Sequence, residues 1–432
     1  MMKQKVPQSI LISFGIAALW SCAQGDQARD NDADVIDRLS KSEPVEVETA
    51  IGPLTLDPPY KTASARNQSK MVKWKDDATP VAPEGFVVTR YADELKHPRR
   101  TYVGKNGDVF VVESNTRGSA DRITLLRDQD GNGRPDEKGV YLEGLKQPYG
   151  MLILDGYFYV ANTDSLMRYP YKEGVARIEA KGEKILDLPA GGYNNHWTRN
   201  LIASKDGKKI YVTVGSASNV GEYGMEREKR RAAILEINPD GSDERIYASG
   251  LRNPVGVDWN PGTGELWSVI NERDELGDNL VPDYLTSVRE DGWYGWPYSY
   301  YGQIKDPRWS HSPHQDLVDK AIIPDVPLGN HTASLGLAFH SGKGLPEKYA
   351  GGAFVGQHGS WNRSKLSGYK VVFVPFDDEG KPQQPEDFLT GFIADPEKNT
   401  VYGRPVGISV LPDGSILVCD DDAGIIWRVA AK

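Results

Sequence analysis

Short runs of alternating apolar and aromatic residues recur along most of the chain, and a turn containing glycine introduces each of them. The clearest copies begin near residues 106, 154, 206, 263, 349 and 412. Runs of this length with a period of two are typical of half-buried β-strands, and the glycine turns favour antiparallel neighbours. No long stretch of helical periodicity separates the copies. The pattern therefore predicts an all-β protein.

Six similar units in one chain favour a β-propeller, in which each blade is a four-stranded antiparallel sheet. We expect a six-bladed β-propeller over residues 81–432. A barrel or a pair of sandwiches is the competing architecture, but neither predicts six units with the same pattern. Longer insertions between the strands carry most of the polar side chains, and loops at strand ends are where a rigid scaffold places functional groups.

The composition agrees with a large folded body and narrows the range of partners. The chain has 432 residues, of which 39% are hydrophobic, and a formal net charge of −10. This length is sufficient for a substantial core. The negative charge argues against nucleic acid or an anionic membrane surface as a general partner.

The first 21 residues have the organisation of an export signal. Lys3 and Lys5 precede an apolar run at residues 10–20, which is too short to span a membrane as a mature helix. Residues 19–22 are similar to the box of bacterial lipoprotein signals, with Cys22 as the lipid acceptor. An ordinary cleaved secretion signal, with Cys22 incidental, is the alternative. Either signal predicts an exported protein, and lipidation would anchor it on the periplasmic side of a bacterial membrane or at the cell surface.

Residues 22–80 are polar, acidic and interrupted by proline. Such a composition is typical of extended linkers that lack a core of their own. We expect a tether from the membrane whose last part packs on the propeller body.

An acidic turn at residues 128–137 has the spacing of a calcium loop. Asp128, Asp130, Asn132 and Asp136 place oxygen ligands at the first, third, fifth and ninth positions of a glycine-containing turn, and Ca²⁺ prefers such ligands. The twelfth position, where a bidentate glutamate is usual, is Gly139. The sequence predicts a structural Ca²⁺ site here, with a solvated acidic hairpin as the alternative.

The loop at residues 190–201 offers an imidazole among amides and glycines. His196 is its only histidine, and histidine titrates near neutral pH, which suits a general base. A structural histidine in a polar loop is the alternative for an isolated residue.

Three further loops each place an arginine before or near a predicted strand. Arg252 and Asn253 stand between glycine and proline, Arg363 lies in the sequence HGSWNR, and Arg404 precedes proline and valine. The arginine fork binds carboxylates and oxyanions. Arginines that converge at one end of an acidic protein would suit an anionic ligand with carboxylates. For Arg252, the alternative is that it caps backbone carbonyls in a tight turn.

Several common chemistries lack a motif in this sequence. It contains no CxxC, HExxH, P-loop, strand-linked GxGxxG or GxSxG. Zinc, nucleotide and serine-hydrolase chemistry are therefore disfavoured.

Residues 250–302, 356–376 and 403–414 together resemble the glucose/sorbosone dehydrogenase family of pyrroloquinoline quinone-dependent, six-bladed propellers. The resemblance covers about residues 81–432 and is strongest to the L-sorbosone dehydrogenase-type branch. It implies a quinoprotein that oxidises a sugar, either an aldose, sorbosone or a related pyranose. It also implies pyrroloquinoline quinone and Ca²⁺ as cofactors, and a quinone or a cytochrome as the electron acceptor.

The resemblance also implies roles for individual residues. His196 matches the general base that takes the proton of the sugar hydroxyl as hydride passes to the quinone. Arg252 and Asn253 match the pair that hydrogen-bonds the reactive quinone carbonyl, which is a pre-organised oxyanion site. Arg404 matches a residue that binds a cofactor carboxylate, and Arg363 falls near the family's other basic cofactor contact.

Two positions depart from the soluble glucose dehydrogenases. Those enzymes hold the cofactor's Ca²⁺ with backbone carbonyls of a Gly-Pro pair, and the corresponding place here is about Arg273 and Asp274. Asn195 precedes His196 where those enzymes have an acid. Both departures weaken the case for glucose as the substrate.

Two other function classes are compatible with a propeller. A non-catalytic, surface-anchored module that binds carbohydrate or protein would keep the scaffold without the quinone. A Ca²⁺-dependent hydrolase such as a lactonase would need a ring of Asp, Asn and Glu ligands, and the arginine-rich loops argue against it.

Overall fold

The computed structural model describes residues 33–75, 77–192 and 195–432. The expected export signal, with Cys22, lies outside the described residues. Strands dominate this part of the chain, and its only α-helices are the short α1 (Ala33–Ser40) and α2 (Gln315–Asp319). None of the helices described is long and apolar enough to cross a membrane. The prediction of an all-β protein is confirmed.

Among the described residues, six sheets have four or five strands each, and we name each sheet by its first strand. The β5 sheet comprises β5 (Pro98–Val103), β6 (Val109–Glu113), β7 (Arg122–Arg127) and β8 (Glu137–Leu142). The β9 sheet comprises β9 (Gly150–Leu154), β10 (Tyr157–Ala161), β11 (Ser165–Pro170) and β12 (Glu183–Asp187). The β13 sheet comprises β13 (Leu201–Ala203), β14 (Ile210–Val214), β15 (Ala233–Ile237), β16 (Arg245–Ser249) and the parallel β20 (Gly292–Trp293).

The other three large sheets follow the same antiparallel order. The β17 sheet comprises β17 (Pro254–Trp259), β18 (Leu266–Ile270), β19 (Pro282–Ser287) and β23 (Val326–Asn330). The β24 sheet comprises β24 (Ser334–Phe339), β25 (Ala353–Gln357), β26 (Lys370–Val374) and β27 (Glu386–Leu389). The β30 sheet comprises β30 (Pro405–Val410), β31 (Ile416–Asp420), β32 (Ile425–Ala431) and the distant β4 (Phe86–Ala92).

Smaller sheets and short turns accompany the six large sheets. β1 (Val45–Thr49) pairs with β2 (Gly52–Leu56), and β21 (Ser299–Tyr300) pairs with β22 (Ile304–Lys305). A three-stranded sheet joins β28 (Ile393–Asp395), β29 (Thr400–Val401) and β3 (Lys70–Met71). Short 3₁₀ turns occur at Met225–Glu228, Pro307–Trp309 and Glu347–Tyr349.

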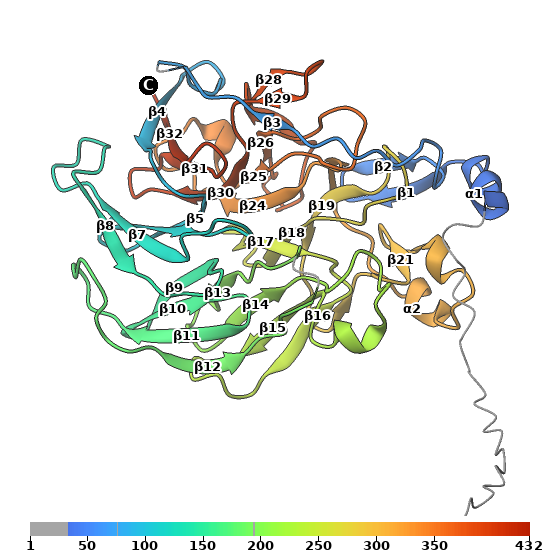
Figure 1. The fold of residues 1–432 in the computed structure, drawn as a ribbon, viewed down its shortest axis with the longest axis horizontal. Helices are drawn as coiled ribbons and strands as arrows, with labels where there is room; N and C mark the ends of the chain where they lie inside the picture. Colours follow the sequence, from blue (N-terminus) through green and yellow to red (C-terminus); the bar gives the residue numbers. More distant parts are fainter. Residues whose placement is uncertain (1–32, 76, 193–194) are drawn as a thin grey trace, which may run out of the picture.

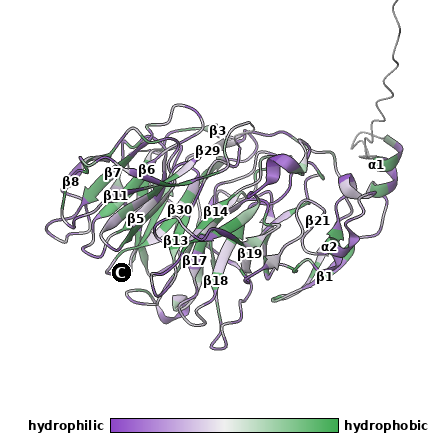
Figure 2. Cartoon of the chain, turned by 90° about the horizontal axis from the view of Figure 1, so that it is seen from below, coloured by the Kyte–Doolittle hydropathy of each residue, from purple (hydrophilic) through white to green (hydrophobic). Residues whose placement is uncertain are grey.

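The first strands of the six sheets form a closed ring. β5 contacts β9, β9 contacts β13, and the series continues through β17, β24 and β30 back to β5. In Figure 1 the sheets accordingly follow one another around the molecule in chain order. Hydrophobic clusters fill the spaces between neighbouring sheets, and Figure 2 shows the apolar residues concentrated on these strands.

Glycines in the first strands let neighbouring sheets approach closely. A Cβ on Gly256 would lie 2.7 Å from Leu337 Cβ of the next sheet, and one on Gly336 would overlap the carbonyl oxygen of Val406. Gly407 repeats the arrangement, since its Cβ would lie 2.5 Å from Arg99 O. Only glycine fits where backbones approach so closely. The repeated Pro-Val-Gly of the sequence therefore marks the inner strands.

Residues 33–80 differ from the expected tether, because most of this segment is folded onto the body. Val47 and Leu56 of the β1–β2 hairpin are buried in the cluster of the β17 sheet, and β3 pairs with β29. Only the expectation that the last part packs on the body agrees with the structure. The segment has too few apolar residues for a core of its own, so its composition is that of a linker. Its few apolar residues nevertheless insert into the body.

Trp74 provides a direct test of this docking. Its ring is 9% exposed and packs 4.8 Å from Tyr402 and 5.2 Å from Trp427, and its indole N–H donates to Asp420 Oδ2 at 3.1 Å. We predict that Trp74→Ala lowers the free energy of unfolding by roughly 3–5 kcal/mol, measured by denaturant unfolding. Val72→Ala, two residues earlier and 37% exposed, should change it by less than about 0.5 kcal/mol. Equal effects of the two variants would contradict a docked segment.

Candidate active site

A cavity of about 540 Å³ opens at the end of the ring where the first strands begin. The first strand of each antiparallel sheet begins where the second strand ends, so the loops before first strands and after second strands meet at this end. Five of the six large sheets supply residues to its wall. The lining residues used below are Gln68, Ser69, Arg99, His196, Asn253, Asp274, His331, His358, Trp361 and Arg404.

His196 lies on the loop before β13 and faces this cavity. Its Nδ1 lies 2.8 Å from Ser216 Oγ and 3.2 Å from Ser216 O. The Ser216 hydroxyl donates its single proton to Ser218 O at 2.6 Å, so it can only accept from the imidazole. The proton of the neutral ring is therefore on Nδ1, and Nε2 carries the basic lone pair.

The surroundings of His196 keep the ring neutral. Burial, helped by the positive charge of Arg252, lowers the pKa of His196 well below its usual value. The negative charge of Asp274 acts in the opposite direction and favours the protonated form. The residue is thus a base at neutral pH, beside a carboxylate that can stabilise a proton once it arrives.

Asn253 lies beside His196, and a glycine makes room for both. Asn253 is buried, and its Oδ1 has no hydrogen-bond partner among the described residues. A Cβ at Gly215 would overlap this oxygen and would lie 2.7 Å from His196 Cβ. Buried polar atoms are nearly always paired in folded proteins. The unpartnered atom is an acceptor, so a ligand with a donor group would satisfy it.

Arg252 does not line the cavity, contrary to its predicted contact with a ligand carbonyl. Its Nε donates to Asn219 O at 3.0 Å, and Nη1 donates to the carbonyls of Asn271, at 3.1 Å, and Glu272. Its Nη2 donates to Asn219 Oδ1 at 2.8 Å and to Asp274 Oδ2 at 3.0 Å. All five N–H groups are therefore satisfied by the protein. The alternative interpretation, that Arg252 caps backbone carbonyls, describes the structure.

The carbonyls near Arg273 and Asp274 do not fit a calcium ion. Arg252 occupies those of Asn271 and Glu272, and Arg273 Nη1 donates to Asp274 O at 2.6 Å. A cation at this place would meet two guanidinium charges at short range. The residues at the position where the resemblance places the cofactor's Ca²⁺ therefore bind arginine side chains instead.

Asp274 and His331 form one side of the cavity. His331 Nε2 donates to Gly277 O at 2.8 Å, and its Nδ1 lies 3.4 Å from Asp274 Oδ1. Burial lowers the pKa of His331, but the hydrogen bond and charge of Asp274, with smaller contributions from Gly277 and Asp283, together raise the pKa above its usual value. Asp274 thus couples three charged or basic groups, Arg252, His331 and His196.

The opposite side of the cavity is basic. Arg404 donates through Nε to His358 O at 3.0 Å and through Nη2 to Gly359 O at 3.1 Å. Arg99 pairs with Asp421 and lies over the Trp197 ring at 5.5 Å, and its buried Nε has no partner among the described residues. Two guanidinium groups at one wall suit a ligand that carries carboxylates.

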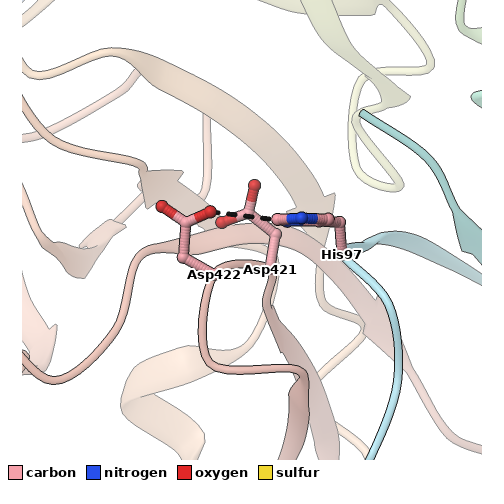
Figure 3. Close-up of side chains that lie close together, drawn as sticks. All are labelled: His97, Asp421 and Asp422. Atoms are coloured by element: carbon pink, nitrogen blue, oxygen red, sulfur yellow. Dashed lines mark ion pairs between the residues drawn. The ribbon is translucent and has the colours of Figure 1, made fainter. Parts of the chain in front are cut away.

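A buried carboxylate organises this basic wall. Asp421 Oδ1 lies 2.9 Å from His358 Nε2, and Asp421 also pairs with Arg99. Despite burial, the neighbouring His358 and Arg99 hold the pKa of Asp421 well below its usual range. His97 and Asp422 complete the cluster, with His97 Nδ1 3.4 Å from Asp422 Oδ1 (Figure 3). The sequence analysis missed this cluster, and the run of three aspartates at residues 420–422 was its only signal.

Two other predicted sites lie away from the cavity. Arg363 is not among its lining residues, and its Nε donates to Asp278 O at 3.1 Å. The acidic turn lies between β7 and β8, where carboxylate oxygens of Asp128, Asp130 and Asp136 approach within 4.8 Å of one another. Asn132 Oδ1 in the same turn accepts from Arg134 N at 2.9 Å. Three carboxylates thus converge in this turn, and those of Asp128 and Asp136 also accept backbone N–H groups within it.

The TrAA12-like family model matches residues 80–290 and 310–432. The chain belongs to this family. The resemblance to the pyrroloquinoline quinone-dependent sugar dehydrogenases is thereby confirmed. The match omits residues before 80, which include Gln68 and Ser69 of the cavity wall.

Several proteins are similar to this chain in sequence. A pyrroloquinoline quinone-dependent pyranose dehydrogenase of Coprinopsis cinerea is 24% identical over 405 residues, which are 80% of this chain and 54% of that protein. A pyrroloquinoline quinone-dependent sugar dehydrogenase of Hypocrea jecorina is 22% identical, over 81% of this chain and 88% of that protein. The chain thus spans about half the length of the Coprinopsis enzyme.

Solved structures share the fold. The holo pyrroloquinoline quinone domain of the Coprinopsis cinerea pyranose dehydrogenase has a TM-score of 0.69 at 21% identity, covering 83% of this chain and 98% of that domain. The calcium structure of the Trichoderma reesei family AA12 protein has a TM-score of 0.70 at 20% identity, covering 82% and 97%. These two structures therefore share the overall fold of this chain.

His358, whose side chain is 12% exposed, makes stability depend on pH in a defined window. Burial, together with the charge of Arg404, lowers the pKa of His358 to about 4, whereas an unfolded histidine titrates near pH 6.5. Between these values the unfolded state binds a proton that the folded state does not, so the free energy of unfolding falls as the pH falls. The contribution is at most about 3 kcal/mol.

We predict that His358→Gln reduces this loss. Denaturant unfolding at pH 7 and pH 4.5 should show a smaller decrease in the free energy of unfolding for the variant than for wild type. His311→Gln, at an exposed position, is the control and should behave as wild type. An unchanged pH dependence in His358→Gln would refute the assignment.

Proposed function

We propose that this chain is a quinoprotein dehydrogenase that oxidises a sugar with pyrroloquinoline quinone. The observation that carries the proposal is one cavity in which a neutral His196 adjoins the unpartnered Asn253 amide and faces Arg99 and Arg404. The names of the relatives in Coprinopsis cinerea and Hypocrea jecorina support the same chemistry.

The residues present fit the cofactor. Its carboxylates would pair with Arg404 and Arg99, and a quinone carbonyl would accept from the Nδ2 group of Asn253. When bound, the quinone would supply a hydride acceptor. Without a metal in the 271–274 loop, the cationic side of the site is provided by the arginines alone.

His196 would remove the hydroxyl proton of the sugar. With Nδ1–H held by Ser216, Nε2 is the atom that accepts this proton, and Asp274 stabilises the resulting imidazolium. The oxygen left by this proton transfer would form the C=O bond of the product, because the hydrogen of the hydroxyl-bearing carbon would pass as hydride to the bound cofactor. Burial keeps the base neutral until substrate arrives.

We extend the proposal to features that the sequence analysis predicted. The six large sheets would be the blades of a six-bladed propeller, closed by β4. The substrate would be an aldose, sorbosone or a related pyranose, and a quinone or a cytochrome would reoxidise the cofactor. A structural Ca²⁺ would bind at Asp128, Asp130, Asn132 and Asp136. Cys22 would carry a lipid that holds the protein at the periplasmic face of a membrane.

The role of His196 can be tested by separating binding from turnover. Purified protein is titrated with pyrroloquinoline quinone by absorbance, and dye reduction is followed across a panel of sugars. We predict that His196→Ala binds the cofactor as wild type does but lowers turnover by about 10²–10⁴. His311→Ala is the control and should retain full turnover. Unchanged turnover in His196→Ala would reject it as the base.

The two late arginines offer a matched pair for cofactor binding. We predict that Arg404→Gln weakens quinone binding about tenfold or more, because a charged hydrogen bond to a carboxylate contributes roughly 1.5–3 kcal/mol. Arg363→Gln should bind the quinone as wild type does, because Arg363 lies outside the cavity.

The absorbance titration of both variants measures this difference. Equal loss in the two would contradict the placement of the cofactor. Absence of quinone binding by wild type would instead favour a non-catalytic carbohydrate- or protein-binding module.

A further inference from the structure

We propose that residues 57–72, here called the strap, form the substrate-binding wall of the cavity, with Gln68 and Ser69 as specificity-determining residues for a neutral sugar. The inference rests on the proposed function and names a part of the site outside the family match, which begins at residue 80. Figure 1 shows this segment crossing from β1 and β2 to β3.

The first part of the strap is fixed to the loop after β18. Tyr60 N donates to Leu276 O at 2.8 Å, and Asp278 N donates to Thr62 Oγ1 at 2.7 Å. A Cβ on Gly277 would lie 2.6 Å from Thr62 O, so the two backbones are in close contact. The same loop carries Asp274 of the catalytic side of the cavity.

The middle of the strap is fixed to the loop after β25. Asn67 N donates to Trp361 O at 2.8 Å, and Asn362 Nδ2 donates to Ala65 O at 2.7 Å. This loop also carries His358, next to the basic wall. These hydrogen bonds, at residues 60–62 and 65–67, fix the position of the strap beside the cavity.

The last part of the strap joins the neighbourhood of the β30 sheet. Lys70 N donates to Asn399 O at 2.8 Å, and Val72 N donates to Val401 O at 2.8 Å. Trp74 then enters the core, as described above. The strap therefore connects loops of the β17, β24 and β30 sheets, and these three sheets hold Asn253, His358 and Arg404.

Gln68 and Ser69 lie between these anchors and line the cavity. Their side chains make no hydrogen bond with other residues in the described part of the chain, so they serve no evident purpose in holding the strap. Trp361 lines the cavity beside them. An amide, a hydroxyl and an indole offer neutral hydrogen bonds and an aromatic face, which suit the hydroxyls and C–H face of a sugar.

Charge divides the cavity between two ligands. Arg99 and Arg404 make one wall cationic and suit the carboxylates of the cofactor, whereas the strap residues in the cavity are uncharged. A neutral polyol has no charge to pair with a guanidinium group, whereas the carboxylates of the cofactor have. We therefore assign the strap side to the sugar and the basic side to the cofactor.

The test compares two double variants from the same segment. In Gln68→Ala/Ser69→Ala the cavity groups are removed, and in Ser64→Ala/Lys70→Ala two exposed strap side chains that do not line the cavity are removed. Each protein is measured for quinone binding by absorbance, for the denaturant midpoint, and for KM and kcat on aldohexoses, aldopentoses and a disaccharide.

We expect the Gln68/Ser69 variant to keep wild-type quinone binding and midpoint. Its KM for the best sugar should rise about tenfold, as two lost hydrogen bonds predict, and the ranking of sugars should change. The control variant should match wild type. An unchanged KM and ranking, with wild-type quinone binding intact, would overturn this inference alone, whereas absence of quinone binding by wild type would overturn the proposed function as well.

Discussion

The pairing of β4 with β32 is the contact on which the rest of the structure depends. The register runs from Ala431 opposite Phe86 to Ile426 opposite Ala92, and it joins the first strand of the body to the last. Through it the β30 sheet becomes complete, and β30 is held between β24 and β5. Arg404 stands directly before β30 and Arg99 lies in β5, so the basic wall exists only when the ring is closed.

Within the closed ring, the state of each arginine distinguishes structural from ligand-binding groups. Burying a guanidinium costs several kcal/mol unless every N–H finds an acceptor. Arg252 meets that condition within the protein, with five acceptors from Asn219 and the 271–274 loop. Arg99 does not, because its buried Nε has no partner among the described residues. The saturated arginine fixes the loop that carries Asp274, and the unsaturated one lines the cavity.

The sequence allowed the all-β fold class to be predicted, and the local geometry explains why only some of the predicted site residues line the cavity. His196, Asn253 and Arg404 each immediately precede or approach a first strand, and all such positions meet at one end of the ring. Arg252 and Asn253 are neighbours in the bend before β17, yet Arg252 binds the 271–274 loop and Asn253 lines the cavity. The motif alone did not indicate which of the two side chains would face the cavity.

What the sequence could not reveal depends on contacts between distant residues. Arg99 and Asp421 are 322 positions apart, and neither belongs to a motif with its own spacing rule. The segment at residues 33–80 had the composition of a linker. Composition indicates whether a segment can form a core of its own, but not whether its apolar residues pack into the core of another part of the chain. Its buried residues insert into two separate clusters of the body. A polar composition combined with a few isolated aromatic residues is therefore compatible with a docked strap, and here that strap reaches the wall of the cavity.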